Sequence, residues 1–218
     1  MLFVCDVSYS LSTAADFFFH SLSFVFTSRA PLAMLPSSVV LQPCSEDRRI
    51  ASVARYAWYL LTRRTGGKGK RSPLPPVVFD IDDTLLRPKR NNVPIKPVLW
   101  LYQQCVRSGY PVYIVTARPD FKENVDATLK TLKQLGIKGS KDVLFMPERD
   151  PDVWEYKWGA RKDIARREGM DVAMTVGDQA WDVLPGRAAR DCSDAVMRGG
   201  IVHHKHVPLQ MGVLVPES

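Results

Sequence analysis

The sequence predicts an α/β fold in which helices flank a parallel sheet. Two observations carry this prediction. Short apolar, β-branched runs of strand length alternate with segments whose apolar residues recur at helical spacing, and such alternation is typical of parallel sheets. Polar and charged residues also follow several of these runs directly. Ligands of open parallel sheets bind at the carboxyl ends of the strands, so we expect a functional site at that edge.

The chain has the length and composition of one globular domain with appendages: 218 residues, of which 45% are hydrophobic and 24% charged. We divide it into an N-terminal segment over 1–44, disordered or serving in targeting, a helix and basic linker over 45–75, and an α/β domain over 76–218. The apolar stretch 17–26 is too short to span a bilayer, and no basic residue precedes it. We therefore expect no membrane span and a cytoplasmic location, with a divergent targeting segment left open.

The balance of charges is basic, with a formal net charge of +7. This favours acidic partners such as phosphate esters, nucleic acid or an anionic membrane. Much of the excess lies between Arg63 and Arg71 and around 161–167, which we interpret as a solvated linker and a solvated helix face. The four cysteines are widely spaced without a Cys-x-x-Cys pair, so we expect reduced cysteines and neither a zinc site nor a disulfide framework.

The first expected helix covers 45–64, with Ser45 as its N-cap, and a basic Gly/Pro-rich linker follows over 66–76. Beyond it we expect strands over 77–81, 111–116, 143–146 and 172–176, a fifth strand within 195–207, and helices from 97 to 109, from 120 to 136, after 157 to 168, and after 178 toward 190. Pro97 opens its helix, since proline is favoured in a first turn, and Asp120 is expected to cap the next one. The buried face of that next helix is expected to contain Phe121, Val125, Leu132 and Leu135.

The domain is organised around the stretch from Val77 to Leu86, where an apolar run ends in three carboxylates and a threonine. Burying an unpaired carboxylate is costly, so a core strand that ends in this way needs those charges, most simply to hold a cation. Asp80 and Asp82 are two residues apart and lean to the same side of an extended chain. The plain alternative is a strand that runs into an Asx-turn or a helix N-cap.

Three further pieces stand at or near the expected strand ends. Thr116 ends the second strand, Lys157 precedes a helix, and Asp178 and Asp182 follow the fourth strand. Each has an ordinary interpretation on its own, as a turn residue, a cap or a solvated side chain. Their common order along the alternating pattern favours a shared site.

These pieces resemble the four motifs of haloacid dehalogenase-like phosphohydrolases. The segment Thr116–Pro119, the Tyr-Lys-x-x-x-Arg-Lys spacing over 156–162 and the Gly-Asp-Gln at 177–179 are similar to class B-type acid phosphatases and plant vegetative storage proteins. The resemblance covers about 76–183. It implies a Rossmannoid parallel sheet flanked by helices, with a minimal cap.

The resemblance also implies roles. Asp80 is the expected nucleophile, which takes the phosphoryl group as an aspartyl-phosphate. The Asp82 side chain is the expected general acid and then base. Mg²⁺ is the expected cofactor, held by the carboxylates of Asp80 and Asp178 and the backbone carbonyl of Asp82. An acid/base group at residue 82 favours phosphate ester hydrolysis over dehalogenation.

The remaining site residues follow from the same resemblance. Thr116 is expected to donate to a phosphoryl oxygen, and Lys157 to offset charge on the phosphoryl group and the nucleophile. Thr84 and Asp182 are expected to support the site, Asp182 by orienting the site or a metal-bound water.

Some positions depart from the family pattern. Ala117 stands where glycine is common, Trp158 stands where serine is usual, and the tail carries a histidine cluster of His203, His204 and His206. We interpret the cluster as an exposed polar strand, with metal binding as the alternative. The inserts after the first two strands are short, so we expect an open site whose specificity comes from loops or a partner subunit.

The sequence thus predicts a Mg²⁺-dependent phosphatase that acts on a small phosphate ester or a phosphorylated macromolecule. A non-catalytic storage or binding protein of the same fold is one alternative. A nucleic-acid end phosphatase, suggested by the basic linker, is another that we favour less. The physiological substrate and the oligomeric state stay open.

Overall fold

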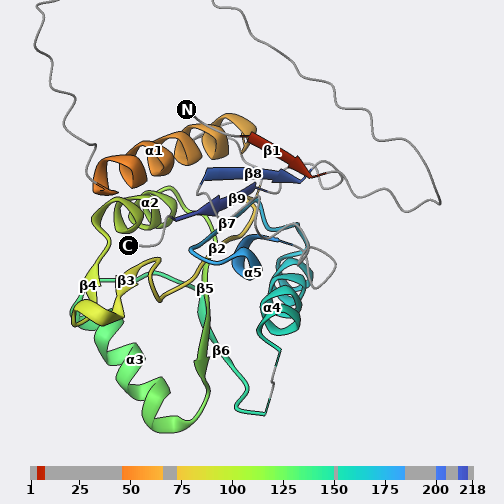
Figure 1. Cartoon of the computed structure of the whole chain (residues 1–218). Coiled ribbons are helices and arrows are strands. Elements are labelled where there is room, and N and C mark those ends of the chain that lie inside the picture. Colours follow the sequence, from red (N-terminus) through yellow and green to blue (C-terminus); the bar gives the residue numbers. More distant parts are fainter. Residues whose placement is uncertain are drawn as a thin grey trace, which may run out of the picture.

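The computed structural model describes residues 4–7, 46–65, 73–149, 152–184, 200–204 and 211–215. Seven strands form one sheet in the order β1-β8-β9-β7-β2-β5-β6, and β3 and β4 form a separate hairpin (Figure 1). The strands are β1 (Val4–Val7), β2 (Val77–Phe79), β3 (Leu86–Arg87), β4 (Val93–Pro94), β5 (Val112–Pro119), β6 (Asp142–Met146), β7 (Met174–Gly177), β8 (Gly200–His204) and β9 (Met211–Leu214). The helices are α1 (Glu46–Thr65), α2 (Lys96–Arg107), α3 (Lys122–Gln134), α4 (Val153–Glu168) and α5 (Ala180–Val183), with a 3-10 turn at Pro88–Arg90.

The predicted α/β fold is confirmed. β2 lies between β5 and β7 and runs parallel to both, β6 and β9 continue the parallel pairing outward, and β8 pairs antiparallel with β9. The chain leaves β2 toward β5 and β6 and then returns to β7 on the other side. The carboxyl ends of β2 and β7 therefore meet where the strand order reverses, which is where open sheets of this kind bind ligands.

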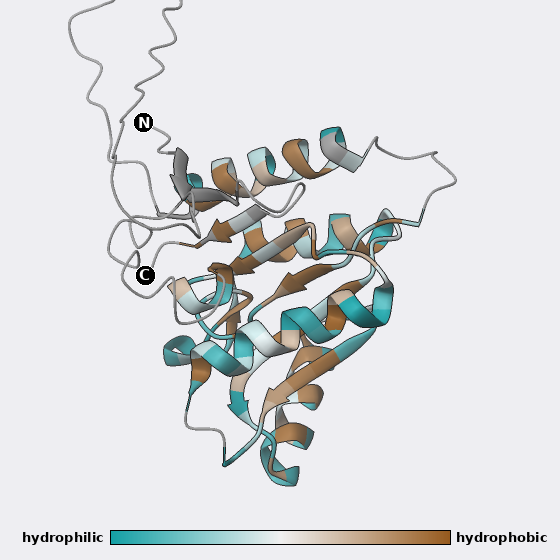
Figure 2. Ribbon diagram, turned by 90° about the vertical axis from the view of Figure 1, so that its right-hand side faces the viewer, coloured by the Kyte–Doolittle hydropathy of each residue, from teal (hydrophilic) through white to brown (hydrophobic). Residues whose placement is uncertain are grey.

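Helices cover both faces of the sheet. α1 and α2 lie on one face, and α4 and α5 lie on the other (Figure 1). The side chains of β2 alternate between these two faces. Val77 and Phe79 are part of the core under α1 and α2, whereas Val78 is part of the smaller core under α4. In Figure 2 the strands are mostly hydrophobic, and the helices that cover them are mixed. A sheet buried on both sides in this way reads as continuous apolar runs in the sequence.

α1 is part of the main core. Its residues Ile50, Ala54, Ala57 and Leu61 are buried together with residues of α2 and the sheet. Burial of a side chain such as Leu61 contributes about 1.5–3 kcal/mol. At the other end of the helix, the hydroxyl of Thr65 is hydrogen-bonded to that of Tyr110, just beyond α2. The helix therefore packs along α2. We predicted the helix, but not this packing, from the spacing of its apolar residues. The domain division at residue 76 stays a prediction.

Several boundaries differ from the predicted ones. Phe121 occupies the N-cap position of α3, and the Asp120 carboxylate accepts the backbone N–H of Glu148 instead, so the prediction that Asp120 caps this helix is wrong. Phe121 is exposed as well, and the buried residues of α3 are Thr128 and Leu132. The reason is that α3 packs on the protruding end of β5 rather than on the centre of the sheet.

α4 begins earlier than predicted, because Asp152 caps it by accepting the backbone N–H groups of Trp154 and Glu155. Lys157 therefore lies within the helix and not before it. The predicted fifth strand is β8, whereas β1 and β9 were not predicted. The expected helix after 178 is α5 in its described part, while its remainder over 185–190 and His206 lie outside the described residues.

The insert between β2 and α2 is filled by the β3–β4 hairpin and the 3-10 turn, in agreement with a minimal cap. Among the helices in the described part of the chain, none is long and apolar enough to cross a membrane.

Candidate active site

The candidate site lies at the carboxyl ends of β2, β5 and β7. Phe79, the last residue of β2, pairs with Val176 of β7, and the N–H of Asp80 donates to the Val176 carbonyl at 2.9 Å. This register places Asp80 next to Asp178, which follows the end of β7. Thr116 lies in the neighbouring β5 and is fully buried. The alignment of parallel strands thus gathers side chains that are nearly 100 positions apart in the sequence.

Lys157 reaches this edge from α4 and is 2% exposed. Its Nζ lies 2.5 Å from Asp80 Oδ1, 2.6 Å from Asp182 Oδ1 and 2.7 Å from the carbonyl oxygen of Val115. These three oxygens match the three N–H groups of an ammonium. Burial acts to lower the pKa of Lys157, but Asp182 and Asp80 outweigh it and raise this pKa above its ordinary value. The lysine is therefore held charged between two carboxylates.

Three buried carboxylates converge beside this lysine. Each of Asp80, Asp178 and Asp182 offers an oxygen, and these atoms lie within 4.8 Å of one another. Burial, followed by the neighbouring Asp182, raises the pKa of Asp178 to about 6. Burial also raises the pKa of Asp80 well above its ordinary value, and Lys157 only partly opposes this shift.

Burial is the first cause of both raised pKa values, and three buried carboxylates around a single lysine ammonium leave an excess of negative charge in this cluster. A divalent cation with hard oxygen ligands would relieve this excess, and carboxylate oxygens are the ligands that Mg²⁺ prefers. Asp80 and Asp178 are the residues best placed to hold it. The Asp182 carboxylate contacts the Lys157 ammonium and the backbone N–H of Gln179, and these contacts suit the supporting role expected for it.

Asp178 is oriented by two neighbours. The Thr84 hydroxyl donates to Asp178 Oδ1 at 3.2 Å, and Gln179 Nε2 donates to Asp178 Oδ2 at 2.7 Å. Thr84 is fully buried at the turn that follows β2, where Asp83 adopts a left-handed φ of 49°. The turn thus brings the threonine back toward β7, and the hydroxyl fixes the Asp178 carboxylate.

Asp82 faces a different partner. Its carboxylate accepts a bidentate pair of hydrogen bonds from Arg118, from Nη2 at 2.6 Å and from Nε at 2.9 Å. Arg118 Nη1 also donates to the Thr128 hydroxyl on α3 at 3.0 Å. The register of β5 and β6 shifts between Thr116 and Pro119, and the irregularity at this point allows the arginine to turn back toward Asp82.

The hydroxyl oxygen of Thr116 accepts the backbone N–H of Arg118 at 3.2 Å. A hydroxyl that accepts one hydrogen bond still has its own proton to donate. Thr116 directly follows Val115, whose carbonyl binds Lys157, so the backbone of β5 reaches the lysine at this point.

Arg161 holds the segment that carries Asp178 and Asp182. Its buried guanidinium donates to the backbone carbonyls of Trp181 at 2.9 Å, Leu184 at 2.5 Å and Asp182. Burial lowers its pKa to about 10. Since Arg161 is one helical turn after Lys157, the same face of α4 supplies both the lysine and the anchor for α5.

The structure therefore brings together Asp80, Thr84, Thr116, Lys157, Asp178 and Asp182, and turns the side chain of Asp82 toward Arg118. Sequence reasoning gave no role to Arg118, and it placed Arg161 on a solvated helix face, which is wrong because Arg161 is buried. A signal for each was available: Arg118 is two residues beyond Thr116 on an extended strand, and Arg161 is four residues beyond Lys157 on a helix.

These features define a class: a Rossmannoid α/β domain with a charged, carboxylate-rich site at the strand order reversal. The family model of haloacid dehalogenase (HAD) superfamily subfamily IIIB, acid phosphatase, matches residues 88–198. The chain belongs to this family, which is named for acid phosphatases. The matched region includes Thr116, Lys157, Asp178 and Asp182, while Asp80 and Asp82 precede it.

Other comparisons add little. A chain of the structure titled "Structure of Pnkp1/Rnl/Hen1 complex" is similar at 16% identity with a TM-score of 0.43, over 59% of this chain and 46% of that chain. This protein thus spans less than half the length of that chain. No curated protein matches.

Proposed function

We propose that the protein is a Mg²⁺-dependent phosphatase that hydrolyses phosphate monoesters through an aspartyl-phosphate at Asp80. One observation carries the proposal: Asp80, Asp178 and Asp182 converge within 4.8 Å, and the Lys157 ammonium lies between two of them. A purely structural cluster of three buried carboxylates would be costly, because one ammonium leaves the others uncompensated.

In the first step a carboxylate oxygen of Asp80 attacks the phosphorus of the ester. The bond from this oxygen to phosphorus forms while the bond from phosphorus to the leaving oxygen breaks, and the leaving oxygen takes a proton. In the second step water attacks the same phosphorus, loses a proton, and releases Asp80 and inorganic phosphate. Lys157 fixes Asp80 Oδ1 throughout and supplies positive charge beside the transferring group.

Asp82 is the proposed proton donor to the leaving oxygen and the proton acceptor from water. Each of its oxygens accepts one hydrogen bond from the Arg118 guanidinium and keeps a second lone pair that can take up or release the proton. We propose that Arg118 positions Asp82. Thr116 would donate its hydroxyl proton to a phosphoryl oxygen.

When bound by the carboxylates of Asp80 and Asp178 and the carbonyl of Asp82, Mg²⁺ supplies charge that offsets the repulsion between Asp80 and the phosphate dianion. Thr84 and Gln179 hold Asp178 in place for this role, and Asp182 orients Lys157. The minimal cap supports a small ester or a phosphorylated macromolecule as substrate.

The test is hydrolysis of an aryl phosphate with and without Mg²⁺, in the wild type and in D80N. We expect Mg²⁺-dependent turnover, a loss of at least about 10³-fold in D80N, and covalent phosphate on a peptide that contains Asp80 after acid quenching. D126N, which removes an exposed carboxylate of α3, is the matched control and should keep full activity. Unchanged activity in D80N would remove the nucleophile assignment. No turnover of any ester would favour the storage or binding protein of the same fold.

A further inference from the structure

The outer surface of α1 and α2 is basic. Six exposed cations lie on these helices: Arg48, Arg49, Arg55, Arg63, Lys96 and Arg107. The sequence contains no Asp or Glu over 48–65 or over 96–107. Within the described residues none of the six forms an ion pair with a carboxylate. The exposed charges of α3 and α4 are of both signs, so among these four helices the described surface that α1 and α2 share is the one with exposed charges of positive sign alone.

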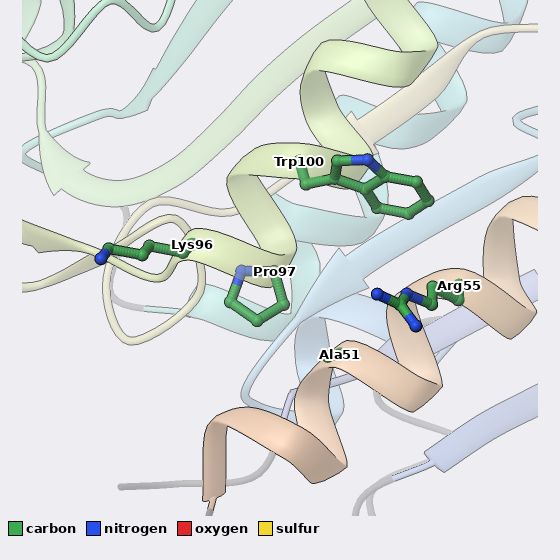
Figure 3. A pocket seen from close by; sticks show the side chains of 5 residues that line it. All are labelled: Ala51, Arg55, Lys96, Pro97 and Trp100. Atoms are coloured by element: carbon green, nitrogen blue, oxygen red, sulfur yellow. The ribbon is translucent and has the colours of Figure 1, made fainter.

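A cavity of about 320 Å³ opens between the N-terminal half of α1 and the first turn of α2. We call it the α1–α2 groove, and it is lined by Ala51, Arg55, Lys96, Pro97 and Trp100. In Figure 3 the Arg55 side chain lies on the α1 side and the partly buried Trp100 ring on the α2 side, while Lys96 extends outward at the rim. Its volume is at the lower end of the range of about 300–1,000 Å³ for ligand pockets. An indole beside a guanidinium suits a planar ring that carries negative charge nearby.

A second pair of rings continues this surface along α1. Tyr56 and Tyr59 are 37% and 50% exposed, and their rings stack with centroids 6.2 Å apart. Arg63 lies over the Tyr59 ring at 6.0 Å and donates to its hydroxyl. From Arg48 to Arg63 the helix extends roughly 22 Å at 1.5 Å per residue. Rings and arginines alternate over a length that several nucleotides of a single strand would cover.

We propose that the α1–α2 groove and the Tyr56–Tyr59 pair bind single-stranded nucleic acid. A base stacks on Trp100 in the groove, Arg55 and Lys96 contact the adjoining phosphates, and the exposed tyrosines receive further bases. Unpaired bases are required, because the faces of paired bases are covered in a duplex. The proposal concerns binding alone and does not depend on catalysis at Asp80.

An anionic bilayer is the other polyanionic surface that such a helix could meet. The apolar face of α1 is already buried in the core through Ile50, Ala54, Ala57 and Leu61. A helix that lies in a membrane interface needs that face for the lipid. The outer face offers separate rings between charges, which matches a nucleic acid strand better.

The experiment is binding of a fluorescent oligothymidylate to the full chain at several salt concentrations, followed by fluorescence anisotropy. R55A/K96A should weaken binding about tenfold or more and reduce the slope of log K against log salt by about 1.4. Y56A/Y59A should weaken binding about fivefold or more at one salt concentration. The matched control, K130A/K133A, removes two exposed lysines of α3 and should leave both quantities unchanged.

Three results would overturn the proposal. The first is no binding by the wild type. The second is equal weakening in R55A/K96A and K130A/K133A, which indicates attraction by net charge alone. The third is binding to vesicles that contain phosphatidylserine without binding to the oligonucleotide. Circular dichroism of every variant shows whether a loss of binding reflects unfolding, and Y56A/Y59A changes exposed side chains only, so it keeps the proposal testable if R55A/K96A misfolds.

Discussion

Gly177 and Asp182 are packed so closely that residue 177 has no room for a side chain. A Cβ on Gly177 would lie 2.1 Å from Asp182 Cβ and 2.5 Å from its Cγ. Asp182 in turn contacts Lys157 and the N–H of Gln179. The glycine at the end of β7 is therefore part of what places the Asp182 carboxylate beside the lysine.

This contact predicts that G177A is damaging. Since Asp182 cannot stay where it is, we expect the Lys157 pair to be disturbed and kcat/KM on an aryl phosphate to fall by about tenfold or more. G159A is the control, because a Cβ at this helical glycine of α4 meets nothing within 4 Å. It should keep activity and gain about 0.5–1 kcal/mol of stability. Wild-type kinetics in G177A would show that the Asp182 position is not needed.

The Arg118–Asp82 contact gives a second prediction. R118K keeps the positive charge but loses the bidentate geometry, and we expect kcat to fall by about tenfold or more while KM changes little. R167K changes an exposed arginine whose nearest carboxylate contact, with Asp142, is 3.3 Å long, and should be neutral. If R118K raises KM and leaves kcat unchanged, Arg118 binds substrate and does not position Asp82.

The sequence predicted those site residues that are recognised by their type and by their position at the end of a strand. Asp80, Thr116 and Asp178 could be placed together because parallel strands align their carboxyl ends, and this rule needs no tertiary detail. The helical spacing from Lys157 could have pointed to Arg161, but its acceptors could not be predicted, because they are the backbone carbonyls of Trp181, Asp182 and Leu184 and leave no mark in the sequence. Gly177 was likewise recognised only as part of a motif. The reason for a glycine at this position is its close contact with Asp182, which the sequence does not display.

Within the fold, errors arose where tertiary packing overrides local signals. Asp120 has the residue type and spacing of an N-cap. Its carboxylate instead accepts the backbone N–H of Glu148, a residue that follows β6. Phe121 and Leu132 share an apolar helical pattern, but α3 covers the end of the sheet, so Leu132 is buried and Phe121 is exposed. β9 was missed because Met211–Leu214 is a short segment that is defined by its pairing with β7.

The raised pKa of Asp178 predicts how stability depends on pH in the metal-free protein. Its value of about 6, against an ordinary 3.8, means that the folded state binds the proton more tightly than the unfolded state. The free energy of unfolding should therefore decrease as pH rises from about 4 to about 6 and stay lower above that, by about 3 kcal/mol. Urea unfolding in the presence of a chelator measures this.

D178N should remove this part of the pH dependence and abolish activity, whereas D126N should change neither. The pKa of Asp80 is raised as well, so a part of the decrease should persist in D178N. Saturating Mg²⁺ should restore stability above pH 6, because it binds the folded state alone. A metal-free wild type with constant stability over this pH range would contradict the raised pKa of Asp178.

The last prediction concerns Arg161, which touches neither the proposed nucleophile nor the substrate. R161K leaves a positive charge but cannot donate to all three carbonyls of Trp181, Asp182 and Leu184 at once. We expect a loss of on the order of 3 kcal/mol of stability, since buried acceptors lose their donors. Because the same segment carries Asp178, the Mg²⁺ concentration for half-maximal activity should rise several-fold while KM for the ester stays close to wild type.

R166A, a change to an exposed arginine of the same helix, should alter neither the stability nor the Mg²⁺ dependence. A less stable R161K with wild-type Mg²⁺ dependence would limit Arg161 to a role in folding.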